Sequence, residues 1–174
     1  MDAQALDRAL TRISHQILEK NQEIKNFGIV GMQTRGVFLA RRIARKISAI
    51  EHIELATGVL DVSFYRDDYR IAIKQPNVKV TNIPFDINGI DMVLVDDVLY
   101  TGRTVRAALD ALTDFGRPKS IQCAALIDRG HREMPIAADY VGMNVTTRSN
   151  QEVALKVVEV DDEDSVWLME GEKT

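Results

Sequence analysis

Hydrophobic residues recur along the first half of the chain at the spacings that mark helices and buried strands. Apolar positions at helical spacing over 6–17, with charged residues on another face, predict an amphipathic helix. A short apolar run at 27–32 predicts a buried strand, and residues 36–47 predict a second helix with a solvated basic face. Residues 55–65 indicate another strand, and the charged, turn-rich stretch 66–88 is expected to form a hairpin or mobile loop.

The second half alternates strand and helix signals in a regular order. The expected elements are a strand at 92–95, a helix at 103–115 that ends at the turn 116–118, a strand at 121–127, and late strands at 153–160 and 166–169 around the acidic turn 161–164. Strand, helix and strand at this spacing predict a βαβ unit and therefore a parallel sheet. No repeat or linker interrupts the pattern, so residues 1–174 are expected to form one α/β domain.

Charge is distributed unevenly along this chain of 174 residues, whose 45% hydrophobic and 28% charged content is typical of a globular protein. The net charge of −4 excludes a strongly basic nucleic-acid binder. However, the acidic excess lies after residue 151, and the preceding part carries 20 basic and 18 acidic residues. A local basic face is therefore compatible with the sequence.

Cys123 is the only cysteine, so the chain can form neither an internal disulfide nor a cysteine-based metal site. It lies in an apolar run, where a buried structural thiol is expected rather than a nucleophile. The N-terminus lacks a signal-peptide pattern, and no apolar run is long enough to span a bilayer. We therefore expect a cytoplasmic protein without membrane contact.

The segment most informative about chemistry is 92–104, MVLVDDVLYTGRT. A buried strand delivers Asp96 and Asp97 to the carboxyl edge of a parallel sheet, where ligands of open α/β folds bind. The following loop offers backbone amides, hydroxyl groups and Gly102 before a helix begins, which favours phosphate binding. The adjacent acids would repel a phosphate but suit sugar hydroxyls. The segment thus indicates a ribose-phosphate ligand.

Other phosphate motifs are excluded, because the loop has neither a Gly-Lys-Ser/Thr ending nor the G-x-G-x-x-G fingerprint. A strand–turn–helix with acidic capping residues and no ligand stays open as an alternative. The segment nevertheless closely resembles the phosphoribosyl-pyrophosphate motif of type I phosphoribosyltransferases. With Tyr100 in the loop it is similar to the pyrimidine-operon regulator/uracil phosphoribosyltransferase family. Three further segments share this resemblance: MQTRG at 32–36, DVSFYRDD at 61–68 and DRGHREMP at 128–135.

The resemblance implies a Rossmann-like type I phosphoribosyltransferase fold, in which a mostly parallel sheet is flanked by helices and carries a small hood and a mobile loop. Asp96, Asp97 and Arg35 would be the catalytic residues, with the acids on the ribose hydroxyls and Arg35 on pyrophosphate. The implied substrate-binding residues are Thr34, Arg35, Gly36, Asp96, Asp97, Val98, Leu99, Tyr100, Thr101, Gly102, Arg103, Thr104, Asp128, Arg129 and Val153.

The implied reaction transfers ribose-phosphate to N1 of uracil and gives UMP and pyrophosphate. Its transition state would be oxocarbenium-like, and catalysis would come from positioning and charge stabilisation rather than from a covalent nucleophile. The loop 66–88 would act as a lid. Mg²⁺ would be held mainly by phosphoribosyl pyrophosphate, without a direct protein ligand. Pyrophosphate loops of this superfamily often contain a non-proline cis peptide.

The family's second activity is UMP-dependent binding of the pyrimidine operon leader mRNA, which causes transcription attenuation. The resemblance places RNA contacts at Thr11, Arg12, His15, His131 and Arg132. A solvated or dimer-facing helix is the alternative for the first three. The family commonly has basic residues at 137 and 143, where this chain has Ala137 and Met143. Each lost cation removes one potential phosphate contact, so weaker RNA binding is expected.

Two other functions remain open at this stage. One is an RNA-binding attenuator with only residual transferase activity. The other is a purine-base salvage phosphoribosyltransferase, which Tyr100 disfavours because purine enzymes usually place an acid there. By resemblance, the chain is also expected to form a homodimer or a higher homo-oligomer.

Overall fold

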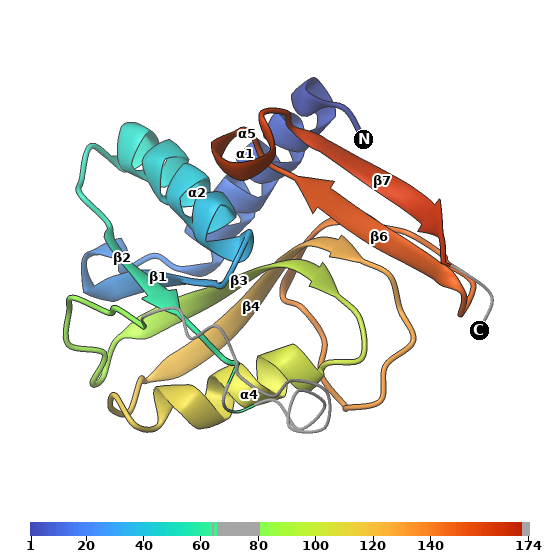
Figure 1. Cartoon of the computed structure of the whole chain (residues 1–174). Helices are drawn as coiled ribbons and strands as arrows, with labels where there is room; N and C mark the ends of the chain where they lie inside the picture. The colour runs from blue at the N-terminus through green and yellow to red at the C-terminus, as the bar shows by residue number, and fades with distance from the viewer. Residues whose placement is uncertain (64, 66–80, 172–174) are drawn as a thin grey trace.

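The computed structural model describes residues 1–63, 65 and 81–171 and is built around a parallel sheet (Figure 1). The strands of this sheet follow the order β2-β1-β3-β4-β5, and every neighbouring pair is parallel. Their bounds are β1 (Phe27–Met32), β2 (Ala56–Leu60), β3 (Asp91–Leu99), β4 (Ser120–Asp128) and β5 (Tyr140–Asn144). The expected parallel α/β architecture is confirmed.

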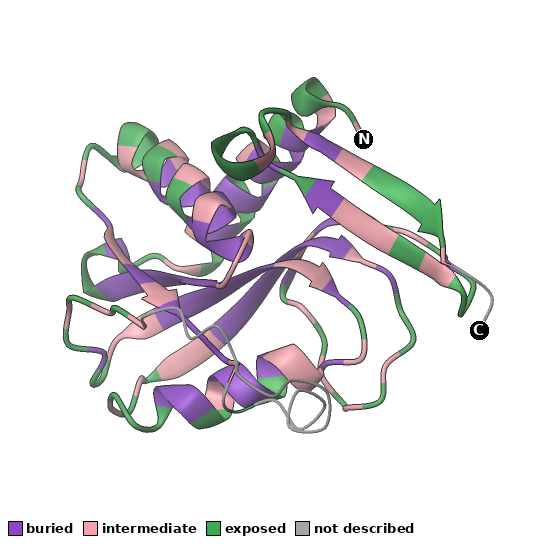
Figure 2. Cartoon of the chain, viewed as in Figure 1, coloured by how far each residue is buried: buried purple, intermediate pink, exposed green. Residues whose placement is uncertain are grey.

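Helices cover both faces of the sheet because each buries one apolar stripe against it (Figure 2). The helices α1 (Ala3–Lys20) and α2 (Gly36–Glu51) share a core with one face of the strands, and α4 (Arg103–Leu112) packs against the other face. The first helix begins where the Asp2 carboxylate accepts the amide of Ala5 at 2.7 Å, which satisfies an otherwise unpaired donor. A short 3₁₀ helix, η1 (Ile24–Asn26), leads into β1.

A small hood follows the sheet: the antiparallel strands β6 (Gln151–Lys156) and β7 (Ser165–Glu170), joined through the short helix α5 (Val158–Asp161). The hood is fastened to the start of the chain by backbone pairing. The amino group of Met1 donates to the carbonyl of Val166 at 2.8 Å, and the amide of Val166 donates back at 2.9 Å. Figure 1 accordingly shows the N-terminus beside β7.

Several element boundaries differ from the expectation. The strand expected at 55–65 ends at Leu60, because the Asp61 carboxylate accepts both the amide (2.9 Å) and the hydroxyl (2.6 Å) of Ser63 and turns the chain. The helix expected at 103–115 ends at Leu112 and continues as turns. The proposed loop at 66–88 lies largely outside the described residues.

The late strand expected at 153–160 is wrong in its second half, where the chain forms α5. Two carboxylates account for the change, since Asp161 accepts the amide of Val157 and Asp164 accepts that of Val158, both at 2.9 Å. Strand β5 was not expected at all. It is a short edge strand, and Gly142 interrupts its apolar alternation.

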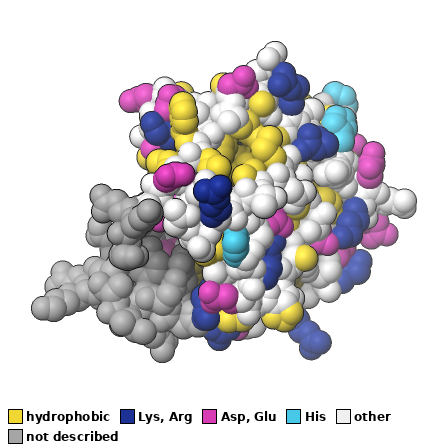
Figure 3. Space-filling model, turned by 90° about the vertical axis from the view of Figure 1, so that its right-hand side faces the viewer, with side chains coloured by type: hydrophobic (Ala, Val, Ile, Leu, Met, Phe, Trp, Pro, Cys, Tyr) yellow, Lys and Arg dark blue, Asp and Glu magenta, His cyan; other side chains and the backbone are white. Residues whose placement is uncertain are grey.

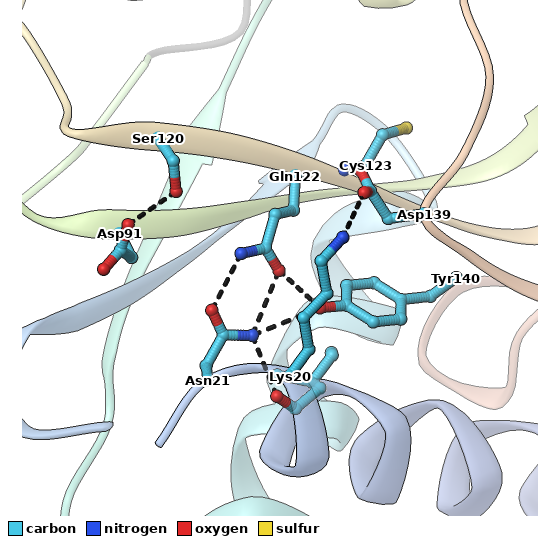
Figure 4. A network of polar contacts seen from close by, with 9 residues as sticks. Lys20, Asn21, Asp91, Ser120, Gln122, Cys123, Asp139 and Tyr140 are labelled. Carbon is cyan, nitrogen blue, oxygen red and sulfur yellow. Dashed lines mark hydrogen bonds and ion pairs between the residues drawn. The ribbon is translucent and has the colours of Figure 1, made fainter. Parts of the chain in front are cut away.

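A fully paired polar network closes the amino edge of the sheet (Figure 4). The Asn21 amide nitrogen donates to Gln122 Oε1 at 3.0 Å and to the Tyr140 hydroxyl at 3.1 Å, and that hydroxyl donates to Gln122. Lys20 pairs with Asp139 at 2.5 Å. The network joins the end of α1 to β4 and β5. Among the described helices, none has the length and apolar character needed to cross a membrane.

Candidate functional site

The carboxyl ends of the parallel strands meet at one edge, and the chemically active loops meet there too. Strand register pairs Met32 with Leu60, Leu99 with Asp128, and Asp128 with Asn144. The loops that follow β1, β3, β4 and β5 therefore leave the sheet side by side. This arrangement gathers most of the expected site residues, as parallel sheets do for their ligands.

The loop between β1 and α2 contains the cis peptide that the family resemblance implied, between Gln33 and Thr34. Directly after it, Gly36 begins α2 in close contact with β3. A Cβ atom at Gly36 would lie 2.5 Å from the carbonyl oxygen of Val95 and 3.2 Å from the Cα atom of Asp96. Only glycine allows the helix start to approach the acidic end of β3 so closely.

Asp96 and Asp97 lie within the last part of β3, which runs four residues beyond the expected end at Val95. Asp96 is buried, with 6% of its surface exposed, whereas Asp97 is half-buried. Asp96 Oδ1 accepts the amide of Asp97, and Asp97 Oδ1 accepts that of Val98, both at 2.9 Å. These bonds hold the two carboxylates at the edge, next to the β1–α2 loop.

The loop after β3 adopts the compact turn that its composition indicates. Gly102 has a φ of +90° and immediately precedes α4. A Cβ atom there would stand 3.1 Å from Met134 Cβ, so the position needs glycine for both conformation and space. The Thr101 hydroxyl accepts the amide of Arg103 at 3.3 Å. The N-cap residue of α4 is Gly102, which has no side chain to cap the helix, so the first turn of α4 begins at this edge with no side-chain bond from its N-cap.

A second segment, 129–136, packs against the loop after β3 and bonds to its backbone. The carbonyl of Thr101 accepts the amides of Glu133 (2.9 Å) and Met134 (3.0 Å), and Arg103 pairs with Glu133 at 2.6 Å. Arg132 donates to the carbonyl of Tyr100 at 2.7 Å and also binds Asp128. Its guanidinium, expected to contact RNA, thus makes internal hydrogen bonds in this structure.

Arg129 joins the loop after β3 to the hood. It is 7% exposed, its guanidinium carbon lies 4.0 Å from the centre of the Tyr100 ring, and it donates to the carbonyl of Gln151 at 2.5 Å. A cavity of about 360 Å³ opens beside it, lined by residues 128–131 and 144–147. Val153, two residues beyond Gln151 on β6, is half-buried and packs against the main core.

Arg35 makes a contact that the sequence did not reveal. Its Nε and Nη2 atoms donate to the two carboxylate oxygens of Asp161, at 3.1 and 2.8 Å. This pairing raises the pKa of Arg35, with a smaller contribution from the nearby charge of Asp97. Asp161 lies in the acidic turn, and its neighbours in sequence give no sign of this pairing. Only the fold, which brings Asp161 opposite Arg35, reveals it.

The expected RNA-binding residues of α1 lie next to β5. Arg12 donates to the carbonyl of Gly142, and His15 is exposed, whereas the Thr11 hydroxyl bonds within the helix to the carbonyl of Asp7 at 2.9 Å. Met143, 43% exposed, follows Gly142 directly. His131 approaches the carbonyl of Thr147 with Nε2 at 2.8 Å. Met143, one of the two positions where the family commonly has a basic residue, is thus the next residue after the carbonyl that Arg12 binds.

The described residues contain no cluster of three or more metal-binding side chains. The half-buried Asp97 carboxylate at the sheet edge nevertheless suits a hydrated divalent cation, because Mg²⁺ keeps several waters and needs few protein ligands. The residues present therefore fit an ion that is carried mainly by a phosphorylated substrate.

Comparisons with known proteins agree with this geometry. Residues 1–163 match the model of the phosphoribosyl transferase domain family. The chain is 54% identical over 170 residues to the "Bifunctional protein PyrR" of Clostridioides difficile (strain 630), an alignment that covers 98% of this chain and 96% of that protein. It is 57% identical over 168 residues to the protein of the same name from Caldicellulosiruptor bescii, with 97% and 92% covered.

The chain belongs to the PyrR family. The fold of this PyrR-family member is also that of solved phosphoribosyltransferases. The hypoxanthine phosphoribosyltransferase of Trypanosoma cruzi superposes with a TM-score of 0.71 at 16% identity, over 99% of this chain and 95% of that one. A hypoxanthine phosphoribosyltransferase of Staphylococcus aureus gives a TM-score of 0.67 at 18% identity, with 91% and 84% covered. At these identities the likeness shows the type I phosphoribosyltransferase fold alone.

Proposed function

We propose that this chain is a single-domain uracil phosphoribosyltransferase that forms UMP and pyrophosphate from uracil and phosphoribosyl pyrophosphate. The observation that carries the proposal is the contact between the start of α2 at Gly36 and β3 at Asp96, which brings an anion-binding loop against a pair of acids. Membership of the PyrR family supports the same reaction and favours uracil over a purine base.

Each loop takes one part of phosphoribosyl pyrophosphate. The amides of residues 101–104 and the hydroxyls of Thr101 and Thr104 bind the 5′-phosphate, at the start of α4 where the helix dipole favours an anion. Asp96 and Asp97 accept hydrogen bonds from the ribose hydroxyls. Thr34, Arg35 and Gly36 hold the pyrophosphate. When Mg²⁺ is bound with this substrate, it neutralises charge on the pyrophosphate oxygens.

Uracil lies near Asp128 and Arg129, with the backbone around Val153 reading its edge. The cavity of about 360 Å³ beside Arg129 falls within the range of small-ligand sites. As N1 of uracil bonds to the ribose C1′ atom, the bond from C1′ to pyrophosphate breaks and its electron pair leaves on the pyrophosphate oxygen, while the N1 proton is released to water. The transition state is oxocarbenium-like, so positioning and stabilisation of the leaving charge supply the catalysis.

Two substitutions test the assignment of the site. Asp97→Asn removes a carboxylate from the ribose position, and Arg35→Ala removes the pyrophosphate-binding guanidinium. We expect each to reduce the rate of UMP formation at least about tenfold with folding intact. Asp110→Asn, on the exposed surface of α4, serves as the control and keeps normal turnover. Near-normal kinetics in both site variants would refute the assignment.

The proposal includes regulation of pyrimidine biosynthesis by UMP-dependent binding of leader mRNA. Arg12 and His15, with His131 and Arg132 in the loop after β4, supply the RNA-contacting face. This face lacks cations at Ala137 and Met143, both exposed. In titrations of leader RNA across salt concentrations, Met143→Lys is therefore expected to steepen the salt dependence by roughly one released counterion. Wild-type binding that is undetectable with UMP present would leave the transferase as the only function.

We further propose that the chain works as a cytoplasmic homodimer or higher homo-oligomer. The support is an exposed apolar set on the hood, and Figure 3, viewed from the hood side, shows hydrophobic side chains gathered among basic ones. The exposed members on β7 are Trp167, Leu168 and Met169. Analytical ultracentrifugation tests this, and a monomer at all concentrations would contradict it.

A further inference from the structure

The guanidinium of Arg35 is held by the hood through an ion pair with Asp161. Arg35 precedes α2, and its partner Asp161 is the last residue of α5, 126 positions further along the chain. The contact is bidentate, with Nε donating to Oδ2 at 3.1 Å and Nη2 donating to Oδ1 at 2.8 Å. Such a fork fixes the plane of the guanidinium as well as its position.

Asp161 is itself held in place. Its Oδ2 atom also accepts the amide of Val157 at 2.9 Å, which closes the short helix upon itself. On either side of Asp161, Glu159 and Asp164 are bound by Arg42 at 2.5 and 2.8 Å. Arg42 lies two helical turns beyond Arg35, on the same face of α2. Arg35 and Arg42 therefore bind α5 and the turn after it to α2.

The ion pair leaves Arg35 able to bind a second anion. A guanidinium has five N–H donors, and the bonds to Asp161 use one donor on Nε and one on Nη2. The donors that remain belong to Nη1 and to the other side of Nη2, which together form a second fork. Because the first fork is fixed by Asp161, the direction of the second is fixed as well.

We propose that Asp161 is a positioning residue for pyrophosphate, which aims the second fork of Arg35 at the leaving group. The inference rests on the proposed function, since it assigns Arg35 to pyrophosphate. Asp161 touches no substrate and acts only through Arg35. Pairing with Arg35 lowers the pKa of Asp161, so the carboxylate stays ionised throughout the neutral range and the ion pair persists there.

The test is a comparison of ligand affinities in the full-length protein. Asp161→Asn keeps the shape of the side chain but replaces one acceptor oxygen with a donor that repels the guanidinium. Calorimetry with Mg²⁺-pyrophosphate is expected to show binding weakened about tenfold, a loss typical for groups that orient a ligand-binding residue. UMP lacks pyrophosphate, so its affinity should stay within about twofold. In steady state, the KM for phosphoribosyl pyrophosphate rises while the KM for uracil is unchanged.

Two variants control for charge and for folding. Asp162→Asn makes the same charge change one residue away at an exposed position, and an Asn there tolerates the φ of +59°. Its pyrophosphate affinity should match the wild type. The double variant Arg35→Ala/Asp161→Asn should bind pyrophosphate no more weakly than Arg35→Ala alone, because Asp161 acts through Arg35.

Each contrary result has a distinct meaning. Unchanged or tighter pyrophosphate binding in Asp161→Asn would overturn the inference, and tighter binding would show that Asp161 competes with the ligand. If Asp161→Asn lost UMP and pyrophosphate affinity equally, Asp161 would have a general structural role and the inference would be wrong. The same would follow if the double variant bound pyrophosphate more weakly than Arg35→Ala. Wild-type protein that forms no UMP would overturn the proposed function itself, whereas normal wild-type turnover with an unchanged Asp161→Asn overturns this inference alone.

Discussion

At Gly36 the β1–α2 loop packs directly against the end of β3, which leads into the second anion-binding loop. Gly36→Ala should therefore push these two loops apart. The added methyl carbon would lie 2.5 Å from the carbonyl oxygen of Val95, whereas ordinary contacts begin at 3.4 Å. The start of α2 must therefore move away from β3 by about 0.9 Å, because the obstacle is backbone and cannot rotate aside.

The consequence for catalysis follows from that displacement. A misplacement of about 1 Å between groups that hold a substrate can cost roughly 10²-fold in rate. The strain of forcing a methyl group into a packed contact costs about 1–3 kcal/mol of unfolding free energy. We expect kcat/KM for phosphoribosyl pyrophosphate to fall by about 10²-fold in a protein that still folds cooperatively.

The assay is steady-state UMP formation at varied phosphoribosyl pyrophosphate, with a urea unfolding curve for each variant. Gly58→Ala in β2 is the matched control, because its Cβ would lie no nearer than 3.2 Å to any neighbour. The contacts are side-chain atoms of Ile83 at 3.2 Å and Val30 at 3.3 Å and the Ile83 Cα atom at 3.3 Å, so a shift of a few tenths of an ångström relieves them. Wild-type kcat/KM in Gly36→Ala would refute the argument that this contact sets the geometry of the site.

Further predictions concern two buried groups away from the site, Tyr140 and Cys123. Tyr140→Phe removes the hydroxyl that bonds Gln122 and should lower the free energy of unfolding by about 1 kcal/mol in urea titration; an unchanged midpoint would contradict the role of this network. Cys123 is buried, and burial raises the pKa of its thiol to about 12. The folded protein should thus resist thiol alkylation at pH 8.5 and react only on unfolding. Because the folded pKa is raised, stability should also decline as pH rises from about 9 toward 12.

Periodicity predicted the central fold well, because the burial of these strands and helices follows from local sequence. Strand β1 begins and ends where the apolar run at 27–32 does, and α1 buries the stripe that its spacing indicated. The acidic pair was also placed correctly at the carboxyl edge of a parallel strand. The residues of a strand–loop–helix segment are contiguous in the sequence, so their placement can be predicted from the sequence alone.

The contacts that join the hood to α2 were missed because both partners look like ordinary surface residues. The basic face of α2 was expected to be solvated, which is wrong for Arg42, since it binds two carboxylates of the hood. The sequence showed an acidic excess after residue 151 but not its partners, and Asp161 and Asp164 pair with arginines more than 120 positions earlier. Pairings at such sequence separation leave no local periodic signal.

The Arg132 guanidinium gives a similar lesson about the site. The RNA contact that the resemblance implies for Arg132 stays a prediction. In the structure the guanidinium binds the carbonyl of Tyr100 and the carboxylate of Asp128, a supporting role for the loop after β3 that the sequence did not indicate. Residues that support a loop from another strand share no spacing with it, so only the fold reveals them. Strand β5, with Gly142 at its centre, escaped prediction because its alternation is too short.

The central claim is tested most directly by measuring nucleotide formation from phosphoribosyl pyrophosphate and Mg²⁺ with uracil, hypoxanthine and guanine in competition. The proposed function predicts that UMP is the main product and that Asp97→Asn abolishes most of its formation. A failure to form UMP, or a preference for either purine base over uracil, would contradict it.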